Sequence, residues 1–192
     1  MSGEQGPRAR LFVAILLPES VREAIARVVE PFREGLDHVR WVRTEQLHLT
    51  LRFIGDVDRP RVPDLGAALA GALRPLPGLT LGITGGGAFP SPLRPSVLWA
   101  GVTPDERLSA IHAATEAAVV EVGIEADTRD FHPHITVGRI RRGRRAPGAG
   151  RVMEGLPLET TAPVREVSLV ESVLGPGGAR HTPVARFRLA GE

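Results

Sequence analysis

Four residue types are absent from this chain of 192 residues: cysteine, lysine, asparagine and tyrosine. Without cysteine the protein can form neither disulfide bonds nor thiolate metal sites, and a reducing compartment is favoured. Without lysine, all 24 basic residues are arginine. The chain is therefore neither a disulfide-stabilised domain nor a cysteine-ligated metal protein.

The sequence pI of 10.6 overstates how basic the protein is. The formal net charge at pH 7 is only +2. It persists because, without lysine, tyrosine or cysteine, almost nothing titrates between about pH 8 and 12. A local feature is more informative: the stretch "GRIRRGRRAPGAGR", 138–151, holds six arginines and no acidic residue. This arginine cluster fits either an RNA-backbone contact or a solvated loop.

No apolar run is long enough to cross a membrane as a helix. The run "LFVAILL", 11–17, is too short for a bilayer span and lacks a signal-peptide cleavage pattern. We therefore expect a soluble, cytoplasmic protein without a membrane partner. The length suits one domain that buries about 70% of its unfolded surface, and we expect a monomer.

Apolar periodicity predicts a mixture of strands and helices. The elements follow no regular parallel β-α-β period, so we expect an α+β fold with antiparallel sheets in two lobes. We expect residues 1–9 and the arginine-rich loop, about 141–151, to be flexible. The expected strands cover 10–17, 47–54, 79–89, 96–102, 133–140, 164–172 and 184–190, and the expected helices cover 20–36, 63–73 and 105–123.

Two similar runs, "LHLTL" from position 47 and "PHITV" from position 133, recur in the two halves of the chain. Their histidines lie 134 − 48 = 86 residues apart. Because side chains alternate along a strand, His48 and Thr50 share one face, and so do His134 and Thr136. The repetition suggests a duplication whose two polar faces converge on one cleft.

Such a cleft suits phosphate chemistry. Two imidazoles can divide acid and base roles near neutral pH. Two hydroxyls can donate hydrogen bonds to the non-bridging oxygens of a phosphate, where charge builds in the transition state. No acidic metal-binding cluster accompanies the two motifs.

The paired H-x-T-x motifs resemble those of the two-histidine (2H) phosphoesterase superfamily. The stretches "RLFVAILLP", "WVRTEQLHLTLRFIG", "VLWAGV" and "FHPHITVGR" are similar to its bacterial and archaeal RNA 2′,3′-cyclic phosphodiesterase branch, formerly called 2′-5′ RNA ligase. The resemblance runs from about Arg10 to Leu189. It implies one domain, 1–192, made of two intertwined, pseudo-symmetric lobes, each an antiparallel sheet with helices packed outside, around a central groove.

The resemblance also implies roles for five residues. His48 is expected to be the proton donor and His134 the proton acceptor. Thr50 and Thr136 are expected to bind phosphate. Arg139, which closes the second motif, matches the family pattern and is a possible substrate contact. The residues alone do not say which histidine is the acid.

The expected activity is hydrolysis of an RNA or oligonucleotide 2′,3′-cyclic phosphate end to a 2′-phosphomonoester, with no metal or cofactor. Three other functions remain open. The same groove could join RNA ends in a 2′-5′ linkage, or act on a small cyclic nucleotide or ADP-ribose cyclic phosphate. The protein could also be an RNA-binding module without catalysis.

The second motif contains a further histidine, His132. We expect it in the loop before the strand, because Pro133 is best placed at a strand start, and either at the rim or in contact with substrate. His132 and His134 could instead bind a metal with His48 or His181. That alternative leaves the motif threonines unexplained.

Three other residues are possible substrate contacts. His181 follows the "GPGGAR" turn, where similar proteins usually carry an aromatic residue, and it could stack on a base. Phe131 could also stack on a base, or pack inside the protein. Arg52, which follows the first motif, could be a substrate contact, a rim charge or an ion-pair partner.

Overall fold

The computed structural model describes residues 7–175 and 178–191. Nine strands and four α-helices make up most of this part of the chain. The strands are β1 (Arg8–Leu16), β2 (Val39–Trp41), β3 (His48–Asp58), β4 (Leu79–Phe89), β5 (Val97–Val102), β6 (His134–Ile140), β7 (Glu159–Val164), β8 (Glu166–Gly175) and β9 (Gly178–Arg188). The α-helices are α1 (Glu19–Val29), α2 (Val62–Leu73), α3 (Glu106–Glu121) and α4 (Pro147–Glu154), and the short 3₁₀ turns are η1 (Glu30–Phe32), η2 (Thr44–Gln46) and η3 (Arg59–Arg61).

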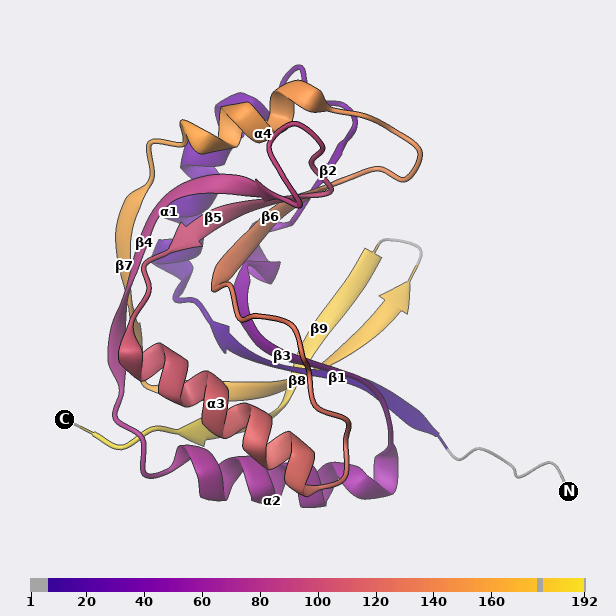
Figure 1. Cartoon of the computed structure of the whole chain (residues 1–192), viewed down its shortest axis with the longest axis vertical. Coiled ribbons are helices and arrows are strands. Elements are labelled where there is room, and N and C mark those ends of the chain that lie inside the picture. The colour runs from indigo at the N-terminus through magenta and orange to yellow at the C-terminus, as the bar shows by residue number, and fades with distance from the viewer. Residues whose placement is uncertain (1–6, 176–177, 192) are drawn as a thin grey trace, which may run out of the picture.

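The strands form one strongly curled antiparallel sheet in the order β7-β4-β5-β6-β3-β1-β8-β9, with β2 paired to β6. Between β6 and β3 the pairing is reduced to Leu49 and Ile135. This narrow junction divides the sheet into two halves, and Figure 1 shows them facing each other. The expected α+β fold with two antiparallel lobes is confirmed, and the lobes share one continuous sheet.

The helices cover the outside of the curled sheet, but the chain crosses between the halves to place them. Helix α1 follows β1 yet packs beside β7 in the other half, and α3 follows β5 yet packs on β3. Helix α2 packs on α3 and β9, and α4 packs on β4 and β5. Because no single boundary in the sequence divides the chain into one segment for each half of the sheet, this arrangement favours one intertwined domain.

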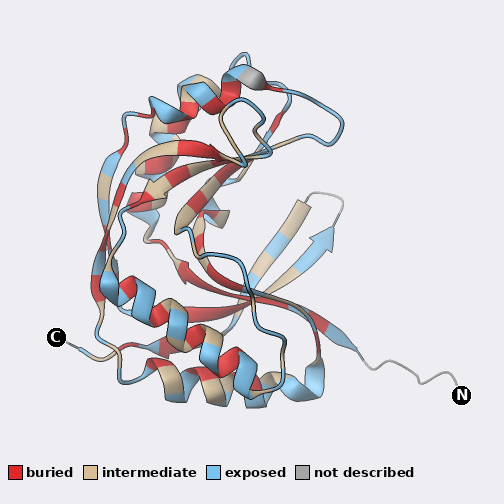
Figure 2. Cartoon of the chain, in the orientation of Figure 1, coloured by how far each residue is buried: buried red, intermediate tan, exposed pale blue. Residues whose placement is uncertain are grey.

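Amphipathic helices close the core beneath the sheet. In α1, Val21, Ile25 and Val29 are buried one turn apart, which is the spacing of one helix face. Figure 2 shows the buried sides of the helices turned toward the sheet. The expected helix 20–36 is too long, because α1 ends at Val29. Pro31 follows in η1. Since proline has no backbone N–H, it cannot donate the hydrogen bond that would continue the α-helix.

Two segments that were expected to be flexible contain residues in regular secondary structure. The arginine-rich stretch overlaps the first part of α4, a helix whose residues Ala149 and Met153 are fully buried against the sheet. At the other end, β1 already begins at Arg8, which pairs with Asp58 at 3.0 Å, and Ala9 is buried. The rest of the segment expected to be flexible, residues 1–6, lies outside the described residues. In the described parts of the chain, no helix is both long and apolar enough to span a membrane.

Candidate active site

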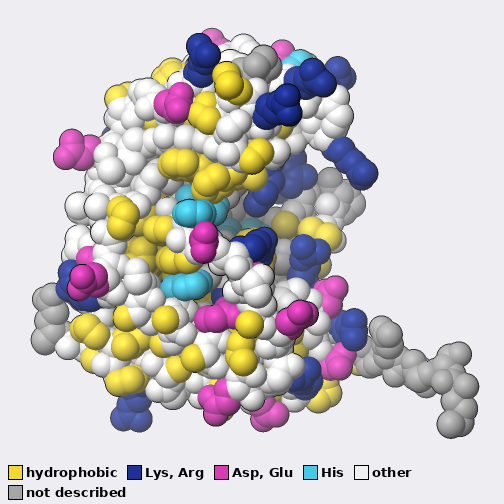
Figure 3. Space-filling model, in the orientation of Figure 1, with side chains coloured by type: hydrophobic (Ala, Val, Ile, Leu, Met, Phe, Trp, Pro, Cys, Tyr) yellow, Lys and Arg dark blue, Asp and Glu magenta, His cyan; other side chains and the backbone are white. Residues whose placement is uncertain are grey.

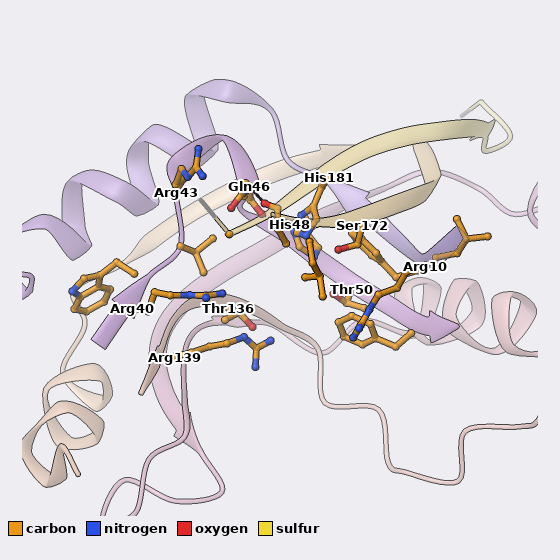
Figure 4. A pocket seen from close by; sticks show the side chains of 18 of the residues that line it. Arg10, Arg40, Arg43, Gln46, His48, Thr50, Thr136, Arg139, Ser172 and His181 are labelled. Atoms are coloured by element: carbon orange, nitrogen blue, oxygen red, sulfur yellow. Dashed lines mark hydrogen bonds between the residues drawn. The ribbon is translucent and has the colours of Figure 1, made fainter. Parts of the chain in front are cut away.

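The two histidine motifs lie on the concave side of the sheet and line one cavity of about 640 Å³. We call this cavity the groove. His48 and Thr50 reach it from β3, and His134 and Thr136 reach it from β6. Figure 4 shows the labelled side chains of both strands, and those of neighbouring strands, directed into this space.

The junction between β3 and β6 accounts for this convergence. Leu49 and Ile135, each in the middle of its motif, pair with each other and are fully buried. Because side chains alternate along a strand, the histidine and threonine on either side of each buried residue must point the opposite way, into the groove. The antiparallel register gives the four side chains a pseudo-twofold arrangement around this pair.

Each motif histidine is oriented by the carbonyl group two residues before it. The Nδ1 atom of His48 lies 2.6 Å from the Gln46 oxygen, and the Nδ1 atom of His134 lies 2.7 Å from the His132 oxygen. A carbonyl oxygen only accepts, so Nδ1 carries the hydrogen in both rings. The Nε2 atom of each ring is therefore left to exchange a proton with a bound molecule.

Each motif histidine also packs against a phenylalanine from a neighbouring element. The ring of Phe12 on β1 lies 5.0 Å from that of His48, and the ring of Phe89 on β4 lies 5.0 Å from that of His134. His181 adds an edge contact to His48 at 5.2 Å. These contacts hold the imidazoles in an apolar surrounding.

Burial lowers the pKa of both imidazoles, because it disfavours the charged form. Burial brings the pKa of His48 to about 4, helped by the nearby His181, Arg139 and His134, while the Gln46 carbonyl opposes the shift. Burial also lowers the pKa of His134, with a smaller contribution from Arg139. Both rings are therefore neutral in the empty groove at neutral pH, and a bound anion would favour their protonation.

A β-bulge follows the threonine of the first motif. On β1, adjacent residues pair with Thr50 and Arg52, so Leu51 is an extra residue on β3. The bulge turns Arg52 away from the groove. Its buried guanidinium lies 2.6 Å from Glu116 and 3.4 Å from Asp127. Arg52 is thus an ion-pair partner, one of the three alternatives for this residue, and it does not line the groove.

An equivalent bulge follows the threonine of the second motif. Adjacent residues of β5 pair with Thr136 and Gly138, so Val137 is the extra residue on β6. Strict alternation would place Gly138 in the groove, but the bulge places Arg139 there instead. Arg139 lies directly opposite Arg40 of β2.

The other predicted residues divide between the groove and the scaffold. His181 lines the groove. Phe131 lies outside its lining and stacks on His112 with ring centroids 3.9 Å apart, which agrees with the packing alternative. His132 also lies outside the lining, and its side chain is exposed. What His132 contributes is the carbonyl oxygen that orients His134.

Several groove residues were missed from sequence. Arg10 and Phe12 line the groove from β1, and their alternation within the predicted strand could have indicated it. Ser172 lines the groove opposite His181 in the β8–β9 hairpin. Gln46 lines it too, and its side-chain amide donates to the carbonyl of Ala179 in β9. These residues come from segments far apart in the sequence, so a local sequence pattern does not predict that they meet in one groove.

The groove is basic. Its described lining includes Arg10, Arg40, Arg43 and Arg139 and no aspartate or glutamate. A cleft lined by one sign of charge attracts ligands of the opposite sign. Among the described residues, no group of three or more histidine, aspartate or glutamate side chains is placed to hold a metal ion.

Comparisons with known proteins agree with this geometry. The family model described as LigT like Phosphoesterase matches residues 15–99 and 101–181. The RNA 2′,3′-cyclic phosphodiesterase of Methanothermobacter thermautotrophicus is 31% identical over 184 residues, which cover 95% of this chain and 100% of that protein. The protein of the same name from Thermus thermophilus is 35% identical over 194 residues, covering 95% and 91%.

A solved structure extends the comparison to three dimensions. The crystal structure of Escherichia coli LigT complexed with 3′-AMP superposes with a TM-score of 0.77 at 31% identity, and the match covers 96% of this chain and 99% of that one. The sequence match, the shared fold and the paired motifs lead to one conclusion: the chain belongs to the LigT-like phosphoesterase family of the two-histidine superfamily.

Proposed function

We propose that the protein is an RNA 2′,3′-cyclic phosphodiesterase, which hydrolyses the cyclic phosphate at an RNA end to a 2′-phosphomonoester without a metal ion. The observation that carries the proposal is the pair of imidazoles whose Nδ1 atoms are held by backbone carbonyls while both rings line one basic groove. The names of the curated relatives support the substrate.

In this mechanism the two Nε2 atoms act on opposite sides of the phosphorus. Neutral His134 takes a proton from water, whose oxygen attacks phosphorus. Protonated His48 gives its proton to the 3′ oxygen as the bond between phosphorus and that oxygen breaks. The products are a 3′-hydroxyl and a 2′-phosphate, and the two histidines have exchanged protonation states. The choice of His48 as the acid rests on the family resemblance.

The hydroxyls and the arginine are assigned to the phosphate oxygens. Thr50 and Thr136 donate hydrogen bonds to the non-bridging oxygens, where negative charge increases in the transition state. Arg139 lies close enough to lower the pKa of both motif histidines. Its positive charge would therefore also attract a phosphate bound between the two rings. Among the described residues that line the groove there is no aspartate or glutamate, so no carboxylate would repel a bound phosphate.

The neutral state of both rings in the empty groove fits this cycle. His48 must carry a proton to act as the acid, and its pKa of about 4 keeps it neutral until substrate binds. A phosphate anion beside the ring raises that pKa by favouring the imidazolium. Substrate binding and proton uptake are therefore coupled.

The decisive experiment is a product assay on an oligoribonucleotide ending in a 2′,3′-cyclic phosphate, with a chelator present. We expect a 2′-phosphate product that accumulates at the same rate with and without the chelator. His38→Ala is the matched control for His48→Ala and His134→Ala, because His38 is exposed and lies outside the groove lining. Activity that is lost in chelator and restored by one added ion would overturn the metal-free mechanism.

The same assay separates the alternatives. A 2′-5′ linked product in the presence of a 5′-hydroxyl RNA would favour ligation. Turnover of an ADP-ribose cyclic phosphate but not of RNA would favour a small-molecule phosphodiesterase. Binding without turnover of any of these would favour an RNA-binding module. Monomeric state, testable by light scattering, and a cytoplasmic location belong to the proposal as well.

A further inference from the structure

Four arginines lie together on the connection between β6 and α4, beginning two residues after the groove residue Arg139. Arg141, Arg142, Arg144 and Arg145 are all exposed, and we call them the arginine patch. None of them takes part in an ion pair with any residue in the described ranges, 7–175 and 178–191. The patch therefore concentrates positive charge that nothing in the described structure neutralises.

The backbone beneath the patch is anchored at both ends. The N–H of Arg141 donates to the carbonyl of His38 at 2.8 Å, and the N–H of Arg144 donates to the carbonyl of Arg141 at 3.0 Å. The turn between them uses Gly143 at a φ of 76°, a conformation that favours glycine. Ala146, directly after the patch, is buried. The four side chains thus project from a defined support.

The patch continues a basic surface that begins inside the groove. Arg139 lines the groove two residues before the patch, directly opposite Arg40. Like charges directly opposite each other on neighbouring strands are unfavourable, and burial together with Arg40 lowers the pKa of Arg139. Figure 3 shows arginine side chains along one rim of the molecule and within the hollow beside the histidines. An anion that spans groove and rim would relieve this repulsion.

The chemistry of the substrate determines what can lie on this surface. A 2′,3′-cyclic phosphate exists only at the 3′ end of an RNA, so the rest of the strand must leave the groove in its 5′ direction. Each preceding nucleotide contributes one phosphate. Arginine recognises phosphate by paired hydrogen bonds and is weakly hydrated. The patch presents arginines without interleaved aromatic side chains, so it suits the backbone of the strand and not its bases.

We propose that the arginine patch binds the phosphates of single-stranded RNA that precede the cyclic phosphate, so the enzyme favours oligonucleotides over mononucleotides. This inference rests on the proposed function for the position of the RNA end. It assigns the patch to substrate selection, while the chemistry stays with the two histidines.

The test compares a mononucleoside 2′,3′-cyclic phosphate with oligoribonucleotides of increasing length that end in the same cyclic phosphate. Two patch variants each remove two charges: Arg141→Gln with Arg142→Gln, and Arg144→Gln with Arg145→Gln. The matched control is Arg74→Gln with Arg188→Gln, since both arginines are exposed and outside the groove lining. In each patch variant, the ratio of kcat/KM for the oligonucleotide to that for the mononucleotide should fall by about tenfold. The logarithm of the oligonucleotide binding constant should also depend less steeply on the logarithm of the salt concentration, with a slope shallower by about 0.7 for each lost phosphate contact.

Binding separates this inference from the proposed function. The affinity for an oligoribonucleotide that ends in a 2′-phosphate is measured by fluorescence anisotropy and requires no turnover. If the protein hydrolyses nothing but the patch variants bind this probe more weakly than the control, the patch proposal stands and the proposed function fails. A wild-type kcat/KM that does not rise with RNA length, or an equal loss in the control variant, overturns the patch proposal. If a patch variant does not fold, the proposal is decided by the wild-type protein alone, from the rise of kcat/KM with RNA length and from the salt dependence of that rise.

Discussion

Within the described chain, Leu49 and Ile135 are the only residues through which strands β3 and β6 pair, and both side chains are fully buried. The pair lies at the centre of the site. Each residue stands between the histidine and the threonine of its own motif, so one backbone pairing orients all four polar side chains. The duplicated pattern in the sequence thus corresponds to a local pseudo-twofold axis.

Removing either motif histidine should abolish most of the activity and leave the fold intact. His48→Ala and His134→Ala are expected to lower kcat by about 10²–10⁴-fold, as for the loss of one general acid or base. Neither ring lies among the fully buried core residues, so the urea midpoint should change little. His132→Ala should keep most of the activity, because its contact with His134 is made by the backbone carbonyl. An inactive His132→Ala beside a fully active His134→Ala would reverse the assignment.

The motif threonines should matter less than the histidines. A hydrogen bond to a charged group contributes about 1.5–3 kcal/mol, which is roughly 10- to 150-fold in rate if the bond forms only in the transition state. Thr50→Ser keeps the hydroxyl and should retain most of kcat, whereas Thr50→Val should not. Equal rates for the two variants would show that this hydroxyl does not contact phosphate.

Two arginines that follow the motifs should behave in opposite ways. Arg52→Gln breaks the buried ion pair with Glu116 and should lower the free energy of unfolding by about 3–5 kcal/mol, measured in urea. The kcat of the folded protein should change little. Arg139→Gln removes a charge that faces Arg40 and should keep or raise stability while it lowers kcat/KM. Identical effects of the two substitutions on stability would contradict this division.

Alternation along strands was sufficient to predict both motif strands and the shared face of each histidine and threonine. It failed one residue beyond each threonine, where Leu51 and Val137 form the bulges. A bulge depends on how the neighbouring strand pairs, so the motif itself carries no signal for it. This is why the sequence left the position of Arg52 open, and why Arg139 could be assigned only by resemblance.

Other errors have similar causes. Helix α4 was missed because glycine and proline in its sequence resemble a loop, and only tertiary burial of Ala149 and Met153 stabilises it. Strand β7 was missed because its partner, β4, lies far away in the sequence. The β8–β9 hairpin is longer than predicted, since β8 reaches Gly175 and β9 begins at Gly178. The longer hairpin is what brings Ser172 and His181 to the groove.

The pH dependence provides the most direct test of the two-histidine mechanism. One ring must be neutral and the other protonated, so both kcat and kcat/KM should be bell-shaped in pH, with limits that belong to the coupled pair. The kcat/KM profile reports the free enzyme. There burial lowers the pKa of both rings, that of His48 to about 4, so its optimum should lie on the acid side of about 6.5, the ordinary histidine pKa.

The kcat profile reports the enzyme with substrate bound, and its limits should lie at higher pH. Bound phosphate favours the imidazolium form of both rings, and this raises their pKa. His181→Gln provides a second check, because His181 is one of the groups that lower the pKa of His48, and its removal should move the kcat/KM profile toward higher pH. Rates measured from about pH 3 to 9 extend below the lower and above the upper histidine limit. A kcat optimum at lower pH than the kcat/KM optimum would mean that substrate binding stabilises the neutral rings, and the phosphate could not then lie between the two histidines.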